Sequence, residues 1–572
     1  MTQSTATSAD RAQTVQVPVA YAIRRAFQKG YGVAELRSDL LAGSVVAIVA
    51  LPLSMALAIA VGAPPEHGLY TAIVAGFVTA LLGGCKFQVT GPTAAFVVVL
   101  APIVNKHGLS GLLTAGFMAG VMLLAMGAFK LGSFIKFIPY PVTTGFTTGI
   151  ATVIATLQLK DALGIRVASM PDHFLERIAA LWQARATTSW HELVIAASTL
   201  ALLVGFPRVT KRIPAPLVAL VFVSLAAWIA HRFVPSFEVA TIASRFHGIP
   251  RTIPAPAFPW STGGLSFSTM RELFTSAFAI AVLGAIESLL SATICDGMTR
   301  TRHDPNAELV GLGVGNIVAP FFGGIAATGA LARTATNIRA GAKSPIAAAT
   351  HSILVLLAML VFAPLVGYVP MASLAALLML VAWNMAEVHA FVGMVKIAPR
   401  SDVVVLVTCF VLTVAFDMVV AVSVGFMLAA VLFMRRMSEL TESKLTIDNT
   451  EERAALRLPP RTSFYEVNGP LFFGAAQRAM DSLHASESDA FDTIIINLGK
   501  VPVIDATGFA ALDNALSALV RRKKKIVLAG PFPHPRSIFD KADLAHAYHG
   551  AVVLAPDLDA ALASAEVLQQ NA

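Results

Sequence analysis

Long runs of apolar residues separated by short polar turns fill the chain from about residue 40 to residue 434. A membrane-spanning helix needs about 20 mostly apolar residues, and many windows of this sequence reach that length. The pattern predicts about 14 apolar segments, several of them too short to span a bilayer alone: 40–62, 69–83, 91–104, 111–128, 135–157, 190–206, 214–231, 271–294, 307–323, 327–338, 345–367, 371–390, 402–416 and 419–434. It therefore indicates a polytopic α-helical membrane protein.

Composition agrees with this interpretation. Of the 572 residues, 56% are hydrophobic and 13% are charged, whereas soluble proteins carry about 25% charged residues. The net charge of +8 does not indicate a nucleic-acid partner, because basic residues of membrane proteins gather in cytoplasmic loops. Residues 1–20 lack the apolar core of a cleavable signal. We expect membrane lipid as a partner and no nucleic acid.

Nothing in the sequence predicts an enzyme. The histidines do not cluster, and a phosphate-binding loop with its lysine is absent from the sequence, which argues against a nucleotide-driven pump. The three cysteines, Cys85, Cys295 and Cys409, lie in or beside apolar segments without metal-ligand or disulfide spacing. We expect no catalytic residues, no metal and no cofactor.

Basic residues predict the orientation. If the N-terminus faces the cytoplasm, every short loop on that side carries Lys or Arg, including Arg300 with Arg302 and Arg435 with Arg436. This is the distribution that the positive-inside rule describes. We expect a multi-pass protein of the cell membrane, here a bacterial inner membrane, with both termini in the cytoplasm.

The composition changes after Arg436. Residues 437–460 are charged and are predicted to form a linker, after which Thr493–Leu498 and Ile526–Gly530 have the pattern of buried strands. A helix is expected between them, from about Gly508 to Arg521. Strands that alternate with helices favour an α/β domain with parallel strands. The predicted organisation is an N-terminal cytoplasmic segment, a membrane domain, the linker and a cytoplasmic α/β domain, at residues 1–36, 37–436, 437–460 and 461–572.

Two apolar segments are interrupted in a way that suggests a binding site. Segment 91–104 opens with Gly-Pro-Thr, and segment 327–338 is short and polar. They are the third and the tenth of the 14, which are equivalent positions in two halves of seven, as in transporters built from inverted repeats. A half-helix that begins inside the membrane presents unpaired N–H groups and a positive dipole end. Two such ends together predict an anion site; the alternative is a simple kink at Pro92.

Side chains near these interruptions are candidates for the site. Thr93 and Thr328 could add hydroxyl donors to it. Arg333, the basic residue within 327–338, could contribute to the electrostatics of an anion site. Alternatively, its side chain could reach the membrane interface, where Arg339 follows.

Glu287 stands alone in the apolar run from Leu273 to Cys295. A carboxylate inside a membrane is energetically costly and is a functional hypothesis by default. Ser291 follows four residues later, on the same face of a helix. Burial favours the neutral form of a carboxyl, which would suit a proton carrier. The alternative is a protonated glutamic acid that only links helices.

Several motifs carry a resemblance to a known family. They are Leu51–Ala56 with Gly62–Tyr70, Gln88–Ala95, Gly323–Asn337 and, near the C-terminus, Val503–Gly508. Together they resemble the SulP (sulfate permease) family of anion transporters, which carry a C-terminal STAS domain. The resemblance implies 14 transmembrane segments in a seven-plus-seven inverted repeat, an elevator-type movement and a homodimer.

The resemblance also implies site residues. The anion would lie between the third and tenth segments, and Glu287 with Ser291 would serve cation coupling. The position of Glu287 is typically Asp in a sodium-coupled bicarbonate branch, so Glu favours protons over sodium. The implied substrate-binding positions are Thr93, Ala94, Thr328, Leu331, Ala332 and Arg333, together with Leu53 and Leu57 of the first span.

Departures from the family pattern leave alternatives open. Leu53 stands where many relatives have Gln, Leu57 where an aromatic residue is common, and Ala326 where proline is frequent. We expect a secondary transporter of sulfate, bicarbonate or dicarboxylate, with proton-coupled symport. The alternatives are a sodium-coupled bicarbonate symporter, a nucleobase permease, and a membrane-anchored STAS regulator with vestigial transport. Thr507 matches a position that is phosphorylated in some STAS proteins.

Overall fold

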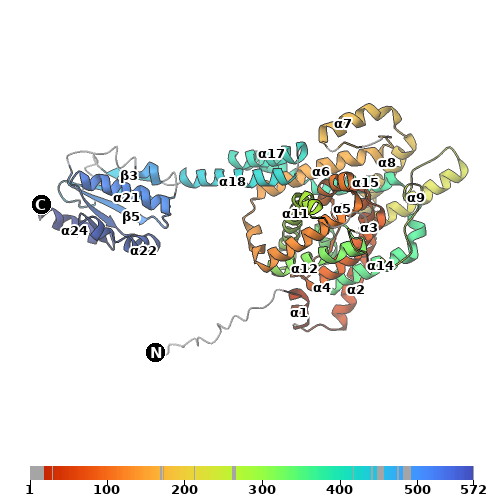
Figure 1. Cartoon of the computed structure of the whole chain (residues 1–572), viewed down its shortest axis with the longest axis horizontal. Helices are drawn as coiled ribbons and strands as arrows, with labels where there is room; N and C mark the ends of the chain where they lie inside the picture. The colour runs from red at the N-terminus through yellow and green to blue at the C-terminus, as the bar shows by residue number, and fades with distance from the viewer. Residues whose placement is uncertain are drawn as a thin grey trace. The chain divides into compact units, whose positions relative to one another are not determined.

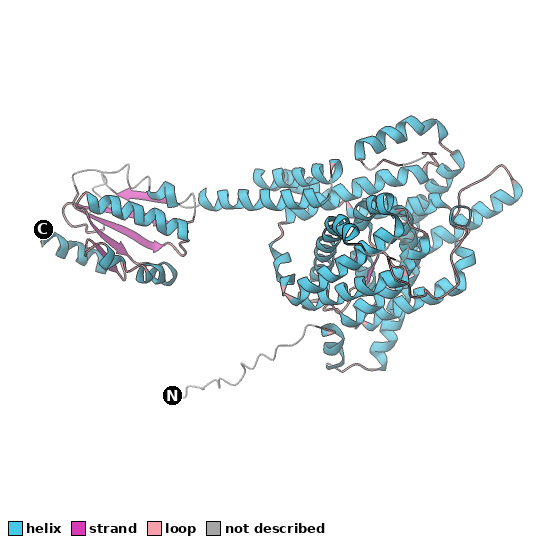
Figure 2. Ribbon diagram, viewed as in Figure 1, coloured by secondary structure: helices cyan, strands magenta, loops and turns pink. Residues whose placement is uncertain are grey.

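The computed structural model describes residues 19–28, 30–167, 170–171, 173–210, 213–260, 266–416, 418–439, 442–446, 456–472, 476–480 and 491–570. It divides into two compact units, Met1–Phe426 and Met427–Ala572. Helices make up nearly all of the first unit, whereas the second contains a sheet with helices (Figures 1 and 2).

Helices follow one another through the apolar part of the chain. Their bounds are α1 Tyr21–Gln28, α2 Val33–Val61, α3 Pro65–Tyr70, the π-helix η1 Thr71–Ala75, α4 Gly76–Leu82, α5 Ala94–Ala128, η2 Leu131–Phe137, α6 Tyr140–Ala162, α7 Phe174–Gln183, η3 Ala184–Thr187, α8 Trp190–Val209, α9 Ala215–Phe233, α10 Ile242–Phe246, α11 Phe267–Thr299, α12 Pro305–Val318, η4 Ala319–Phe322, α13 Leu331–Arg339, α14 Ile346–Val366, α15 Met371–Met385, α16 Val388–Ile397, α17 Arg400–Ala415 and α18 Met418–Glu439.

The prediction of a polytopic helical membrane protein is confirmed. Within the described residues, nine helices are long and apolar enough to cross a membrane. One difference concerns the predicted segments 91–104 and 111–128, which form the single element α5. Gly108 interrupts it with a φ of 67°, a backbone conformation that glycine adopts readily. Gly108 alone therefore separates the two helical segments, where the sequence predicts a turn of several residues.

The two interrupted segments meet at their starts. Strand β1 (Thr90–Gly91) pairs antiparallel with β2 (Thr328–Gly329), with Thr90 opposite Gly329 and Gly91 opposite Thr328. Each strand leads directly into a helix, β1 into α5 and β2 into α13. The chain before β1 is not helical, so Pro92 lies at a helix start. The alternative of a kinked continuous helix is therefore wrong.

Close helix packing surrounds this short ribbon. Helix α12 packs along α5, α11 packs against α5 and β2, and α2 packs against both α5 and α13. A Cβ atom at Gly313 of α12 would lie 2.5 Å from the backbone nitrogen of Leu124 of α5. Small residues of this kind allow membrane helices to approach at backbone distance. The ribbon is thus held between helices from both halves of the chain.

The second unit contains a five-stranded sheet in the order β3-β4-β5-β6-β7. Strands β4 (Thr462–Asn468), β5 (Thr493–Lys500), β6 (Lys525–Ala529) and β7 (Val552–Ala555) are parallel neighbours. The other elements are β3 (Glu442–Thr446) and the helices α21 Ala506–Arg521, α22 Pro533–Lys541, α23 Leu544–Ala547 and α24 Leu558–Gln570.

This sheet agrees with the predicted parallel α/β domain and differs at its edge. The expected strands appear as β5 and β6, and the expected helix as α21. Strand β3 pairs antiparallel with β4 and lies within 437–460, which the sequence assigns to a linker. A short charged strand at a sheet edge has no clear apolar alternation, which is why the pattern did not reveal it. Part of 437–460 lies outside the described residues.

Candidate functional site

Two helix starts lack side-chain caps where the halves of the membrane unit meet. The residues that precede α5 and α13 are Thr93 and Ala330, and among the described contacts neither accepts a capping hydrogen bond on its side chain. The first N–H groups of a helix have no partner within the helix, and they carry the positive end of its dipole. Both helix starts therefore present donors and positive potential beside the ribbon of β1 and β2.

Arg333 of α13 crosses to the start of α5. Its side chain is 1% exposed, and Nη2 donates a hydrogen bond to the backbone oxygen of Pro92. A Cβ atom at Gly91 would lie 2.5 Å from Nη1 of Arg333, so only glycine leaves space for the guanidinium. The side chain is buried beside β1, and the alternative in which it reaches the membrane interface does not hold in this structure.

The charge of Arg333 is incompletely satisfied. Within the described residues, its Nε and Nη1 have no hydrogen-bond partner, and no carboxylate lies within ion-pair distance of it. A buried charge without a counter-charge is strongly destabilising. A bound anion could satisfy these two nitrogens, since arginine binds oxyanions in a bidentate manner.

Glu287 of α11 contacts the start of α5. The hydroxyl of Thr93 donates a hydrogen bond of 3.0 Å to Oε2 of Glu287, which explains why Thr93 does not cap its own helix. Glu287 is half-buried. Ser291 is 2% exposed, and among the described residues its hydroxyl has no partner. The structure thus joins Glu287 to one helix start and leaves the Ser291 oxygen free.

Ser288, which the sequence analysis did not single out, connects α11 to β2. The backbone N–H of Gly329 donates to Oγ of Ser288 at 2.8 Å, and Thr328 donates to the carbonyl oxygen of Gly284 at 3.1 Å. The Ser288 and Thr328 hydroxyls lie 2.8 Å apart, so Ser288 is the donor of that pair. The Thr328 hydroxyl is therefore used within the protein, where the sequence predicted a donor to the anion. The position of Ser288 beside Glu287 was the available signal.

Further polar contacts fix α13 to the segment that leads into β1. Val89 donates its N–H to Oγ1 of Thr334 at 3.1 Å, and Asn337 donates from Nδ2 to the backbone oxygen of Phe87 at 2.9 Å. On α12, Asn316 accepts from the N–H of Ala327 at 2.8 Å and donates to its oxygen at 2.9 Å. These side chains fix the segments that lead into β1 and β2.

The other predicted substrate-binding residues lie on three helices. Ala94 is buried at the start of α5, whereas Leu331 and Ala332 are exposed at the start of α13. Leu53 and Leu57 are buried on α2. The structure therefore brings together Thr93, Ala94, Glu287 and Arg333, while the two leucines contribute to the helix that packs against both starts.

Thr507 lies in the other unit. It is exposed in the first turn of α21, where Asp505 caps the helix by accepting from the N–H of Gly508 at 2.6 Å. Throughout the part of the chain that is described, no group of three or more His, Cys, Asp or Glu side chains is placed to hold a metal ion.

Comparisons with known proteins agree with this geometry. The sulfate permease family matches residues 36–409, and the STAS domain matches residues 453–561. A Bacillus subtilis protein named "Putative sulfate transporter YvdB" is 42% identical over 518 residues, covering 91% of this chain and 96% of that protein. The bicarbonate transporter BicA of Picosynechococcus is 29% identical over 530 residues, covering 89% of this chain and 91% of its own length.

Solved structures show the same fold. The murine Solute Carrier 26 family member A9 anion transporter in its inward-facing state gives a TM-score of 0.83 at 18% identity, covering 99% of this chain and 96% of that one. The transmembrane domain of a cyanobacterial BicA gives 0.60 at 27% identity, covering 70% and 98%. These relatives are transporters and not enzymes. The chain therefore belongs to the sulfate permease family, as a multi-pass membrane transporter with a C-terminal STAS domain.

Proposed function

We propose that this chain is a secondary active transporter that moves a small oxyanion together with a proton. The substrate class is sulfate, bicarbonate or dicarboxylate. The observation that carries the proposal is the buried guanidinium of Arg333, which lies at the junction of two uncapped helix starts with two nitrogens unpaired within the described residues.

The anion would bind between the starts of α5 and α13. Backbone N–H groups at both helix ends would donate to its oxygens, and Arg333 would add charge-assisted hydrogen bonds from Nε and Nη1. The exposed Leu331 and Ala332 and the buried Ala94 would surround it with apolar contacts. The buried Leu53 and Leu57 would support this wall from α2.

Glu287 would carry the proton. Its hydrogen bond from Thr93 places the carboxyl next to the residue that precedes α5. An ionised Glu287 would repel an anion at that helix end, whereas a protonated one would not. By linkage, proton binding and anion binding would strengthen each other, typically by about 1–3 kcal/mol, or roughly 5–150-fold in affinity.

A sodium-coupled bicarbonate symporter is the second candidate, and one observation favours it. The Ser291 hydroxyl, one helical turn after Glu287, has no partner among the described residues. It could supply a second oxygen ligand to a sodium ion beside the Glu287 carboxylate. Proton coupling is the main proposal because a single carboxyl is enough to carry a proton.

The remaining features of the proposal rest on family membership. We infer an elevator-type movement, a homodimer, and a cell-membrane location with both termini in the cytoplasm. The STAS domain would serve structure and regulation, and exposed Thr507 stands at the position that is phosphorylated in some STAS proteins. The alternative of a membrane-anchored regulator would give a purified protein that transports neither sulfate nor bicarbonate.

The test is uptake into proteoliposomes. Wild type, Glu287→Gln and Glu272→Gln would be compared for labelled sulfate and bicarbonate uptake under an inward proton gradient, with and without sodium. Glu272 is an exposed carboxylate on the same helix and serves as the matched control. We expect wild type and Glu272→Gln to concentrate the anion, and Glu287→Gln to bind it without pH dependence and without uphill uptake. Concentration by Glu287→Gln, or a wild type that requires sodium and ignores pH, would contradict proton coupling.

A further inference from the structure

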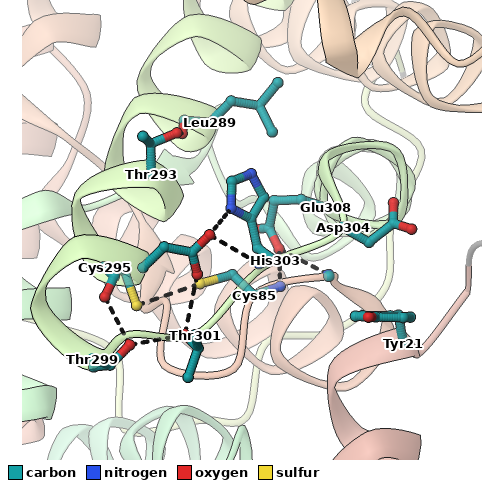
Figure 3. A network of polar contacts seen from close by, with 12 residues as sticks. Tyr21, Cys85, Leu289, Thr293, Cys295, Thr299, Thr301, His303, Asp304 and Glu308 are labelled. Carbon is teal, nitrogen blue, oxygen red and sulfur yellow. Dashed lines mark hydrogen bonds and ion pairs between the residues drawn. The ribbon is translucent and has the colours of Figure 1, made fainter. Parts of the chain in front are cut away.

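Glu308 is a buried carboxylate that lies outside the contacts described so far. It belongs to the first turn of α12 and is 1% exposed. Its Oε2 accepts the backbone N–H groups of Gly84 at 2.9 Å and Cys85 at 2.8 Å. Its Oε1 accepts a hydrogen bond of 2.7 Å from Nε2 of Gln88. Figure 3 shows the carboxylate beside Cys85, with a dashed line to the backbone of that residue.

Gln88 carries this contact to the ribbon. It lies two residues before Thr90 of β1, and its amide occupies the space in which a Cβ atom of Gly329 would stand on β2. The same amide group therefore contacts both Glu308 and the opposite strand. Any displacement of Gln88 would act on both strands, from which α5 and α13 begin.

We propose that Glu308 and Gln88 form a clamp that positions the two helix starts, and that they are positioning residues for the anion site. This proposal rests on the proposed function, because it takes the starts of α5 and α13 as the place where the anion binds. Neither side chain contacts the anion. The clamp sets the distance and direction of the donors that do, and a small misplacement of such groups has a large effect on binding.

The hydrogen bonds of the clamp make Glu308→Gln a conservative change. A glutamine oxygen at this position can accept the Gly84 and Cys85 N–H groups, and its NH2 group can face Gln88. Among the described residues, Oε1 of Gln88 has no partner, so the Gln88 amide can rotate to accept from it. Alanine at position 308 or 88 has no polar side-chain atom that could replace the lost hydrogen bonds.

The experiment measures sulfate and bicarbonate dissociation constants and melting temperatures for the purified full-length protein. We expect Glu308→Ala and Gln88→Ala to weaken binding about tenfold, or about 1.4 kcal/mol. We expect Glu308→Gln to stay within about threefold of wild type, since it preserves the hydrogen bonds. Gln88→Ala removes one hydrogen bond to Glu308 and remains informative if Glu308→Ala does not fold.

Asp304→Ala is the matched control. Asp304 precedes Glu308 by one turn and accepts the N–H groups of Asn306 and Ala307 of its own helix, each at 2.9 Å. This control should lower the melting temperature and leave anion affinity unchanged. The clamp is refuted if Gln88→Ala binds like wild type, or if Asp304→Ala weakens binding as much as Glu308→Ala. If wild type binds neither anion, the result refutes the proposed anion site. It would then be distinguishable from a failure of the clamp, which requires that wild type binds the anion.

Discussion

Replacing Arg333 with alanine tests the central contact of the proposed site. The guanidinium donates one hydrogen bond to Pro92 and has two nitrogens, Nε and Nη1, without a partner among the described residues. The substitution removes these donors and the positive charge. The N–H groups at the starts of α5 and α13 remain in place, so we expect weaker binding and not its loss.

The magnitude follows from these contacts. A hydrogen bond to a charged group contributes about 1.5–3 kcal/mol. If the two free nitrogens of Arg333 bind one anion with partial geometry, the combined loss is about 3 kcal/mol, or roughly 150-fold in the dissociation constant. The stability of the empty protein should change little, because losing the contact to Pro92 is offset by removing an unpaired buried charge.

The assay is equilibrium binding of sulfate and bicarbonate to purified wild type, Arg333→Ala and Arg339→Ala. Arg339 is exposed at the end of the same helix, so its removal makes the same change in net charge without touching the ribbon. We expect Arg339→Ala to bind like wild type. Equal affinities for wild type and a folded Arg333→Ala would refute the reasoning, and equal losses in both variants would show a long-range charge effect instead of contact.

Two further predictions concern the ends of the chain and the STAS domain. Proteases added to sealed right-side-out vesicles should leave both termini intact, and cleavage of a tag at either end would contradict the predicted orientation. In the C-terminal unit, the hydrogen bond from Arg461 holds the pKa of Asp492 below its ordinary value of 3.8. Because the folded-state pKa is lowered, the stabilisation is present above about pH 4 and is lost as the pH falls through that lowered value. In Arg461→Ala, an NMR titration should find the Asp492 pKa returned towards 3.8, and an unchanged pKa would exclude this contact in solution.

Much of the site geometry could be predicted because backbone chemistry leaves local signals. The Gly-Pro-Thr sequence at residues 91–93 indicated a helix start, and the short polar segment 327–338 indicated its counterpart. The pairing of β1 with β2 agrees with both. Glu287 was recognisable because a carboxylate in an apolar run has few structural explanations.

The residues that hold the site could not be found in this way. Glu308 looks like an ordinary acidic residue in the first turn of a helix, where the helix dipole favours one. Its partners Gly84, Cys85 and Gln88 lie more than two hundred positions earlier, and no local pattern links them. Ser288 is similar, because its role depends on the N–H of Gly329. Contacts between residues that are far apart in the chain leave no periodic pattern and no fixed spacing in the sequence.

The pairing of β1 with β2 has a consequence for how the protein is made. Thr90 and Gly91 leave the ribosome long before Thr328 and Gly329, yet each strand is the other's hydrogen-bonding partner. Unpaired backbone groups are costly in a bilayer, so the start of α5 cannot reach its final depth in lipid until α13 has been synthesised. Until then, water or the insertion machinery would have to supply hydrogen-bonding partners for the backbone groups of β1. Substitutions at Gly91 or Gly329 should therefore reduce the yield of inserted protein before any effect on transport can be measured.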